Sequence, residues 1–388
     1  MKLEGRAVWL LALLPLVLLG ALVAVILRTG FADAVRGEIP PIEALSFQRV
    51  DLTPEGFVVE VLNDGSDPVR IAQVQVDEAY WSFTQQPAGA LGRLGRARLA
   101  IPYPWVKDET HVIRLVSSTG VTFDHEIAVA VATPRPGWRF FGLFALIGLY
   151  VGVIPVALGL LWYPLIGRLG ARALAFLLAL TVGLLLFLLV DAAHEGLEAI
   201  EGMPGAFQGV ALFVFGVAAA YLGIEAFGAA LSRRQGAAAW VTALLVAIGI
   251  GLHNLGEGLA IGAALGLGQA ALGRLLILGF TLHNTTEGLA IVAPIAKTPV
   301  SFARLLLLGV VGGLPTVAGA WIGGFFYSPT LSVLFLALGA GAIAQVVVKI
   351  TQGLAADRPL ADALRSGPVL AGLGAGFALM YTTGLLVQ

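Results

Sequence analysis

From Trp138 to its last residue, the chain consists of long apolar stretches separated by short connections. A helical stretch of about 20 apolar residues crosses the roughly 30 Å hydrocarbon core of a bilayer. Because backbone inside a bilayer must satisfy its own hydrogen bonds, such stretches are expected to be α-helices. The sequence predicts eight spans, at about 140–164, 173–197, 208–230, 238–265, 271–295, 303–327, 331–350 and 367–387.

Overall composition supports a membrane protein. Of the 388 residues, 58% are hydrophobic and 12% are charged, whereas soluble domains carry roughly 25% charged residues. The net charge of -1 gives no reason to expect a nucleic-acid partner. The chain has no cysteine, which excludes disulfides and thiolate metal sites.

Basic residues in the connections predict the orientation. Lys and Arg concentrate in cytoplasmic connections. With residue 138 outside, the inner ends and connections contain Arg168, Arg172, Arg233, Arg234, Lys297, Arg304, Lys349, Arg358 and Arg365. The outer connections are poor in basic residues, and Arg274 lies near an outer edge. The C-terminus is therefore expected outside the cytoplasm.

Residues 8–27 form a further uncharged run, preceded by Lys2 and Arg6. The run is long enough to cross a bilayer, and the preceding charges predict a cytoplasmic N-terminus. The alternative is a cleaved signal peptide, whose apolar region is shorter, at about 7–15 residues. We therefore expect residues 1–29 to be a transmembrane anchor.

Residues 30–136 have a different pattern, in which charges return and apolar positions alternate. Ala72, Val74 and Val76 are expected on one face of a strand, with the polar residues between them on the other. Turn residues separate several such runs, which predicts an antiparallel β-sandwich. Since it follows a cytoplasmic N-terminus and one span, the sandwich should be extracytoplasmic. Whether it is a docking domain, a homodimer contact or a lid stays open.

One motif occurs twice within the apolar region. His253-Asn-Leu-Gly-Glu257-Gly-Leu and His283-Asn-Thr-Thr-Glu287-Gly-Leu share the frame HNxxEGLAI. Residues four apart share one face of a helix. Each histidine lies fifteen residues from Gly268 in the turn between the two spans. In an antiparallel hairpin both histidines should therefore lie at the same depth, near the middle of the membrane.

Ionisable groups at that depth are costly and normally face a partner or a path. No Lys or Arg of the sequence is expected near enough to neutralise the two glutamates, so a divalent cation is the expected partner. Imidazole and carboxylate groups suit Zn²⁺ and related ions, and Asn254 and Asn284 can add carbonyl oxygens. The alternative is a structural role, with histidine and glutamate hydrogen-bonded across the hairpin.

On these motifs, HNLGEGLAIG at 253–262 and LHNTTEGLAI at 282–291, the chain resembles the ZIP family of divalent metal transporters, most closely its bacterial branch. The resemblance covers about residues 138–388. It implies eight spans with both ends of this core outside, and a site in the fourth and fifth spans. The implied metal ligands are His253, Asn254, Glu257, His283, Asn284 and Glu287.

The chain departs from the family pattern at several positions. Gly256 and Thr286 stand where the family motif has proline. Thr316 stands in the sixth span where the family often has another acidic ligand, and Asn284 replaces a carboxylate found in some members. One metal ion is therefore expected rather than two.

Two further groups of polar residues are candidates for a metal path. Asp191, His194 and Glu195 lie near the outer end of the second span, where they could collect cations. A solvated helix end is the alternative. Gln345 in the seventh span shares a face with Lys349 and is a second candidate for the path.

Together these features predict an all-α polytopic membrane protein of the cell membrane, with an anchor at 1–29, an extracytoplasmic all-β sandwich at 30–136 and an eight-helix transport domain at 137–388. The expected function is import of divalent metal ions, with Zn²⁺ as the substrate and iron, manganese or cadmium as alternatives. No phosphate-binding G-x-x-x-x-G-K-[ST] motif is present, and no enzymatic activity is expected. A metal sensor and an intramembrane metalloenzyme are the alternative functions.

Overall fold

The computed structural model describes residues 5–29, 42–235, 238–355 and 359–385. The chain divides into two compact units, Met1–Ile42 and Glu43–Gln388, which are described separately. The first unit contains helix α1 (Gly5–Thr29), whose central residues are apolar and exposed. Its described apolar stretch, Leu13–Ile26, is shorter than the membrane-spanning segments described below, so the anchor stays a prediction. Lys2, which contributes to the predicted orientation, lies outside the described residues.

The second unit begins with eight strands in two four-stranded antiparallel sheets. The strands are β1 (Leu45–Thr53), β2 (Gly56–Asn63), β3 (Ile71–Val76), β4 (Ala79–Trp81), β5 (Thr84–Gln86), β6 (Arg96–Ile101), β7 (His111–Ser117) and β8 (Thr122–Ile127). Their order is β1-β2-β6-β5 in one sheet and β4-β3-β7-β8 in the other. Apolar residues of both sheets, such as Val59 and Leu99 in the first and Val74 and Leu115 in the second, form one buried cluster.

Strand β3 corrects one detail of the predicted alternation. Val74 and Val76 are buried as expected, but Ala72 is exposed and Ile71 is buried instead. The pairing of β3 with β7 shifts in register between Ile71 and Gln73. A β-bulge there reverses the alternation. Strict alternation of buried and exposed residues therefore predicts the wrong side of the strand for Ala72.

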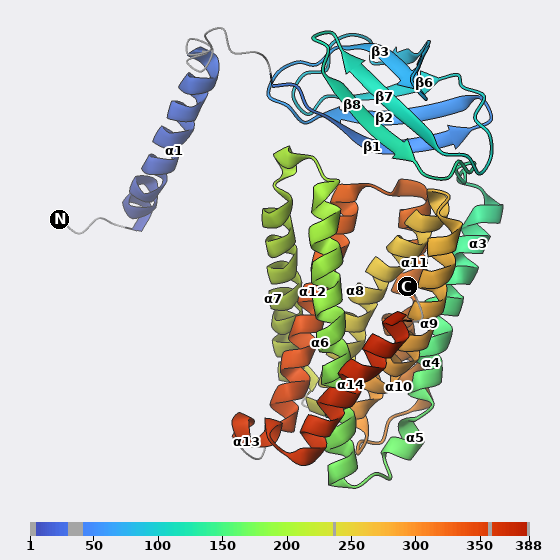
Figure 1. The fold of residues 1–388 in the computed structure, drawn as a ribbon. Helices are drawn as coiled ribbons and strands as arrows, with labels where there is room; N and C mark the ends of the chain where they lie inside the picture. Colours follow the sequence, from blue (N-terminus) through green and yellow to red (C-terminus); the bar gives the residue numbers. More distant parts are fainter. Residues whose placement is uncertain (1–4, 30–41, 236–237, 356–358, 386–388) are drawn as a thin grey trace. The chain divides into compact units, whose positions relative to one another are not determined.

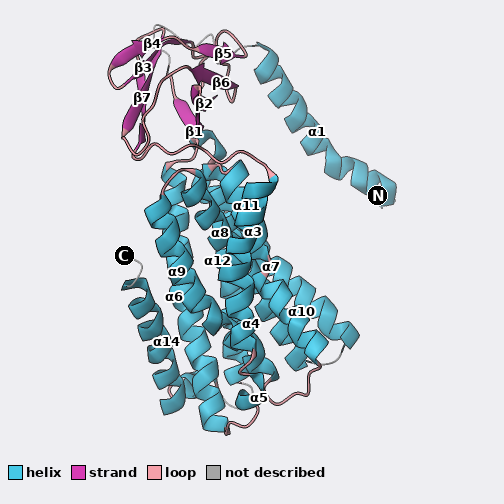
Figure 2. Ribbon diagram, turned by 90° about the vertical axis from the view of Figure 1, so that its right-hand side faces the viewer, coloured by secondary structure: helices cyan, strands magenta, loops and turns pink. Residues whose placement is uncertain are grey.

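The remainder of the second unit is helical (Figures 1 and 2). Its principal helices are α3 (Trp138–Gly148), α4 (Ile154–Leu160), α6 (Ala171–Glu201), α7 (Gly209–Gln235), α8 (Ala238–Gly266), α9 (Ala270–Val292), α10 (Phe302–Gly313), α11 (Pro315–Phe326), α12 (Pro329–Leu354) and α14 (Gly367–Leu385). Two short helices complete the set: α5 (Tyr163–Ile166), which follows α4, and α13 (Leu360–Leu364), which lies between α12 and α14.

Seven segments of the described chain are long and apolar enough to span a membrane: Trp138–Ile166, Ala171–Glu201, Gly205–Arg233, Ala239–Gly266, Leu272–Ile295, Phe302–Phe326 and Pro329–Leu354. They match the first seven predicted core spans. The eighth prediction falls on α14, whose described apolar stretch, Gly367–Thr382, is shorter than these seven. Arg358, one of the basic residues used for the orientation, lies outside the described residues.

Two of the spans are interrupted helices. A π-helical segment, Leu149–Val153, separates α3 from α4, and Pro155 follows it at the start of α4. The sixth span is divided at Leu314, directly before Pro315, into α10 and α11. Proline has no backbone N–H and does not continue a regular helix. Both interruptions lie beside the helices that carry the repeated motif.

Glycines allow these helices to approach closely. A Cβ atom at Gly258 on α8 would lie 2.1 Å from the carbonyl oxygen of Thr316 on α11. A Cβ atom at Gly288 on α9 would lie 2.2 Å from the carbonyl oxygen of Val156 on α4. Small residues permit such contacts between membrane helices. The glycine after each glutamate of the motif is therefore required by packing.

Candidate metal site

The repeated motif lies on α8 and α9, which form a helical hairpin. Helix α8 ends at Gly266 and α9 begins at Ala270, with Gly268 at a positive φ of 80° in the turn. This is the turn expected from the spacing of the two histidines. The left-handed backbone at Gly268 is a conformation that glycine adopts readily.

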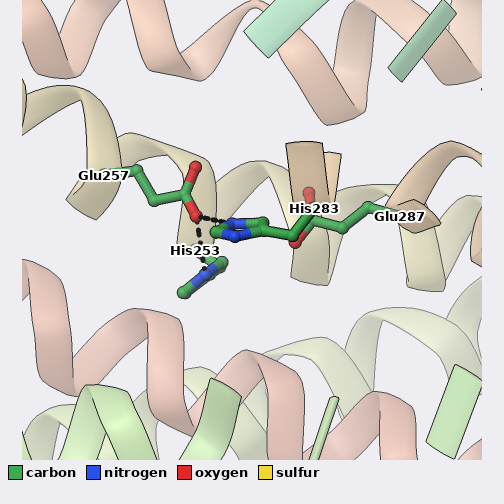
Figure 3. A group of neighbouring side chains, drawn as sticks. All are labelled: His253, Glu257, His283 and Glu287. Atoms are coloured by element: carbon green, nitrogen blue, oxygen red, sulfur yellow. Dashed lines mark hydrogen bonds and ion pairs between the residues drawn. The ribbon is translucent and has the colours of Figure 1, made fainter. Parts of the chain in front are cut away.

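The hairpin brings four side chains of the motif together. His253, Glu257, His283 and Glu287 each offer one potential ligand atom, and these atoms lie within 4.8 Å of one another (Figure 3). Glu257, His283 and Glu287 are buried, and the side chain of His253 is 11% exposed. The two imidazole rings lie 6.4 Å apart between centroids. Equal spacing from the turn thus places both copies of the motif at one site.

Glu257 contacts both histidines through one carboxylate oxygen. Its Oε1 is hydrogen-bonded to Nε2 of His283 and lies 3.1 Å from Nε2 of His253 (Figure 3). Its other oxygen, Oε2, accepts a hydrogen bond of 3.0 Å from Nδ2 of Asn284. A hydrogen bond between histidine and glutamate across the hairpin is what a purely structural role of the motif would require. Of the two glutamates, Glu257 makes this bond and Glu287 does not.

Glu287 is in a different position. Both of its carboxylate oxygens are buried, and neither has a hydrogen-bond partner among the described residues. A buried polar group without a partner is costly, and a buried charge more so. Since Glu287 lies in the same cluster as Glu257, the site contains more acidic groups than its own hydrogen bonds satisfy.

The two asparagines of the motif are also buried and lie beside the cluster. Asn254 donates from Nδ2 to the carbonyl oxygen of Gly312 at 3.0 Å, and Asn284 donates to that of Val151 at the same distance. The Oδ1 atoms of both asparagines are buried and have no hydrogen-bond partner among the described residues. Each amide is thus held by its nitrogen, and its oxygen is left without a donor.

A small cavity adjoins the cluster. Its volume is about 20 Å³, enough for about one water-sized occupant. Its lining includes His253, Glu257 and His283, and no Lys or Arg is found among the described residues that line it. No Lys or Arg among the described lining residues is therefore available to balance the acids of this cavity. The chemistry of the groups, two imidazoles and two carboxylates, suits a divalent transition metal.

Asp191 and Glu195 on α6 also line this cavity. A neighbouring cavity of about 220 Å³ shares both residues with it, together with Phe280 and His283. The two acids, four residues apart on one face of α6, thus lie between the cluster and a larger space. The ring of Phe280 lies 5.4 Å from that of His283.

The remaining predicted path residues lie elsewhere. His194 is exposed, with Nδ1 3.5 Å from Oε1 of Glu198. Gln345 is buried and donates to Glu225 on α7, which also pairs with Lys349. Neither His194 nor Gln345 is part of the cluster, and neither lines the cavity beside it.

Sequence reasoning missed three contributors to the site: the carbonyl groups of Val151 and Gly312, and the ring of Phe280. Pro155, four residues after Val151, is a sequence signal that could have identified the first. Pro315, three residues after Gly312, similarly marks the second interruption. No sequence pattern distinguishes Phe280 from the other aromatic residues of the spans.

The fold and the site define a class: a polytopic helical membrane protein with a buried His/Glu cluster that could hold a metal ion. Comparison with known proteins does not narrow this class. No model of a protein family matches the chain, and no curated protein matches its sequence.

Proposed function

We propose that the protein is a membrane transporter that carries divalent metal ions, with Zn²⁺ as its principal substrate, through the site between α8 and α9. Glu287 carries this proposal, because it is a buried carboxylate beside two imidazoles and a second carboxylate, and neither of its oxygens has a hydrogen-bond partner among the described residues. A divalent cation among these groups would supply the missing charge and the missing partners. Ligands of this kind, without thiolate, also permit release.

His253, Glu257, His283 and Glu287 are the proposed ligands. Asn254 and Asn284 flank them, and their unpartnered oxygens are available as further donors. The cavity beside the cluster has room for about one water-sized occupant, which favours one ion at a time. Thr316, buried on α11, adds no carboxylate that would support a second ion.

The proposed route to the site passes Asp191 and Glu195. Both acids line the small cavity and the larger one beside it. Negative charge at the mouth of a path raises the local concentration of cations. Phe280 lines both cavities and lies against His283, so its ring is the proposed barrier between the larger space and the site.

The arrangement of helices is compatible with alternating access. Helices α3, α4, α8, α9, α10 and α11 pack among themselves and hold the site, whereas α6, α7, α12 and α14 form a second set. Helix α12 also packs against α8, so the sets share an interface. We propose that motion at this interface exposes the site to one side at a time. The proposed direction is import. The two β-sheets of residues 45–127, hereafter the β-domain, and the C-terminus are proposed to be extracytoplasmic and the N-terminus cytoplasmic, from the distribution of basic residues. A C-terminus outside the cytoplasm is also what the resemblance to the ZIP family implies.

The test is metal entry into proteoliposomes loaded with a metal-sensitive fluorophore, with Zn²⁺, Fe²⁺, Mn²⁺ and Cd²⁺ compared. Wild-type protein should give rapid entry, and Glu257→Gln and Glu287→Gln should abolish it. Glu201→Gln, at the exposed end of α6, is the matched control and should behave as wild type. Metal binding without entry would favour a sensor and would refute transport.

A further inference from the structure

The carbonyl group of Val151 lacks its regular helical donor. In an α-helix this carbonyl would accept a hydrogen bond from the N–H of the residue four positions later. That residue is Pro155, which has no N–H. The π-helical segment Leu149–Val153 contains Val151 and adds a further irregularity at this point. π-Helical turns of this kind occur frequently at functional sites.

The amide of Asn284 takes the place of that missing donor. Its Nδ2 donates to the carbonyl oxygen of Val151 at 3.0 Å and to Oε2 of Glu257 at 3.0 Å. An amide nitrogen has two hydrogens, so both are used. Turning the amide over would place its oxygen against two acceptor oxygens, and this determines its orientation.

As a consequence, both carboxylate oxygens of Glu257 have hydrogen-bond partners, which fix the orientation of the carboxylate. Oε1 contacts the imidazole of His283, and Oε2 accepts from Asn284. We infer that Asn284 is a positioning residue: anchored on the Val151 carbonyl, to which Pro155 cannot donate, it orients the carboxylate of Glu257 for a divalent metal ion. This inference rests on the proposed function. It gives Pro155 and the interruption between α3 and α4 an indirect role in metal binding.

Two variants separate this role from general packing. Asn284→Leu has a side chain of similar size but lacks both the Nδ2 donor and the Oδ1 that is available to a metal ion, so Pro155→Ala, which keeps Asn284, is the variant that isolates the contact. Pro155→Ala leaves every proposed ligand in place and returns an N–H to the helix. Regular α-helical geometry, which turns the Val151 carbonyl along the helix axis, is then expected to lengthen its contact with Asn284. Matched controls are Thr281→Val, whose hydroxyl donates to the carbonyl oxygen of Ile277 in its own helix, and Pro164→Ala, which removes a proline from α5.

The measurement is titration of the purified full-length protein with Co²⁺, followed by the absorption spectrum of the bound ion. Loss of a group that orients a metal ligand typically lowers affinity about 10- to 100-fold. Asn284→Leu should fall in this range, and Pro155→Ala should shift affinity and spectrum in the same direction. Because both act through one contact, the double variant should bind like Asn284→Leu alone. Both controls should match wild type.

The outcomes distinguish this inference from the function on which it rests. Wild-type affinity in Asn284→Leu, or effects of the two substitutions that multiply in the double variant, would overturn the positioning role and leave the metal site intact. A wild-type protein that takes up no Co²⁺ would overturn the metal site itself, and the positioning role with it.

Discussion

Glu257 on α8 and His283 on α9 are hydrogen-bonded to each other although 26 positions separate them in the chain. The contact joins the two copies of the motif across the hairpin. It also distinguishes the two glutamates, because Glu257 has its partners within the protein whereas both oxygens of Glu287 are unpartnered among the described residues.

Removing the charge of Glu287 should abolish stabilisation by metal. A ligand that binds only the folded state stabilises it by about 2.7 kcal/mol at a concentration of 100 Kd. Wild-type protein should therefore melt at a higher temperature as Zn²⁺ is added, and Glu287→Gln should not. Glu198→Gln, at a largely exposed position on α6, is the control and should retain the shift. An undiminished shift in Glu287→Gln would exclude this carboxylate as a ligand.

The glycine after Glu257 offers a test of helix packing at the site. In Gly258→Ala the new Cβ meets the backbone of α11, so α8 and α11 must separate. Overpacking of this kind costs about 1–3 kcal/mol of stability, and it should also weaken metal binding at the adjacent Glu257. Gly256→Ala is the matched control, because its Cβ would meet only the end of Leu336, at 3.9 Å. Equal thermal stability of the two variants would contradict the packing argument.

Gln345 should not contribute to transport. It bonds to Glu225, whose other oxygen pairs with Lys349 at 2.7 Å, and it does not line the cavity beside the cluster. Gln345→Leu should therefore leave the rate of Zn²⁺ entry within about twofold of wild type. Its stability should fall by about 1–3 kcal/mol at most, the range for loss of a buried hydrogen bond. A severe loss of transport in a well-folded variant would show instead that Gln345 contributes to the metal path.

The sequence was sufficient for the features that depend on local pattern. Long apolar stretches predicted the helices, and the matched spacing around Gly268 predicted that the two motifs meet. It was insufficient where a contact depends on distant segments or on an irregularity. The bulge in β3 exposes Ala72, Glu225 binds Gln345 from another helix, and Val151 accepts from Asn284 across 133 positions. Periodicity in the sequence predicts none of these three features, because each depends on how separate elements are placed relative to one another.

The β-domain should lose stability in mild acid through His125. Burial lowers the pKa of this histidine below its ordinary value of 6.5, and its ring stacks on Phe47 at 5.0 Å. As pH falls through about 6.5, the unfolded chain binds a proton there, whereas the folded chain does so only at lower pH. Stability must therefore fall across this window, since the unfolded state binds more protons.

His125→Phe keeps a ring beside Phe47 and removes the titrating group. Its unfolding midpoint should consequently change less than that of wild type between pH 7.5 and pH 5, measured by the intrinsic fluorescence of the full-length protein. His194→Gln, at an exposed position on α6, controls for the loss of a histidine and should keep the wild-type dependence. If His125→Phe is as acid-sensitive as wild type, another group governs the response.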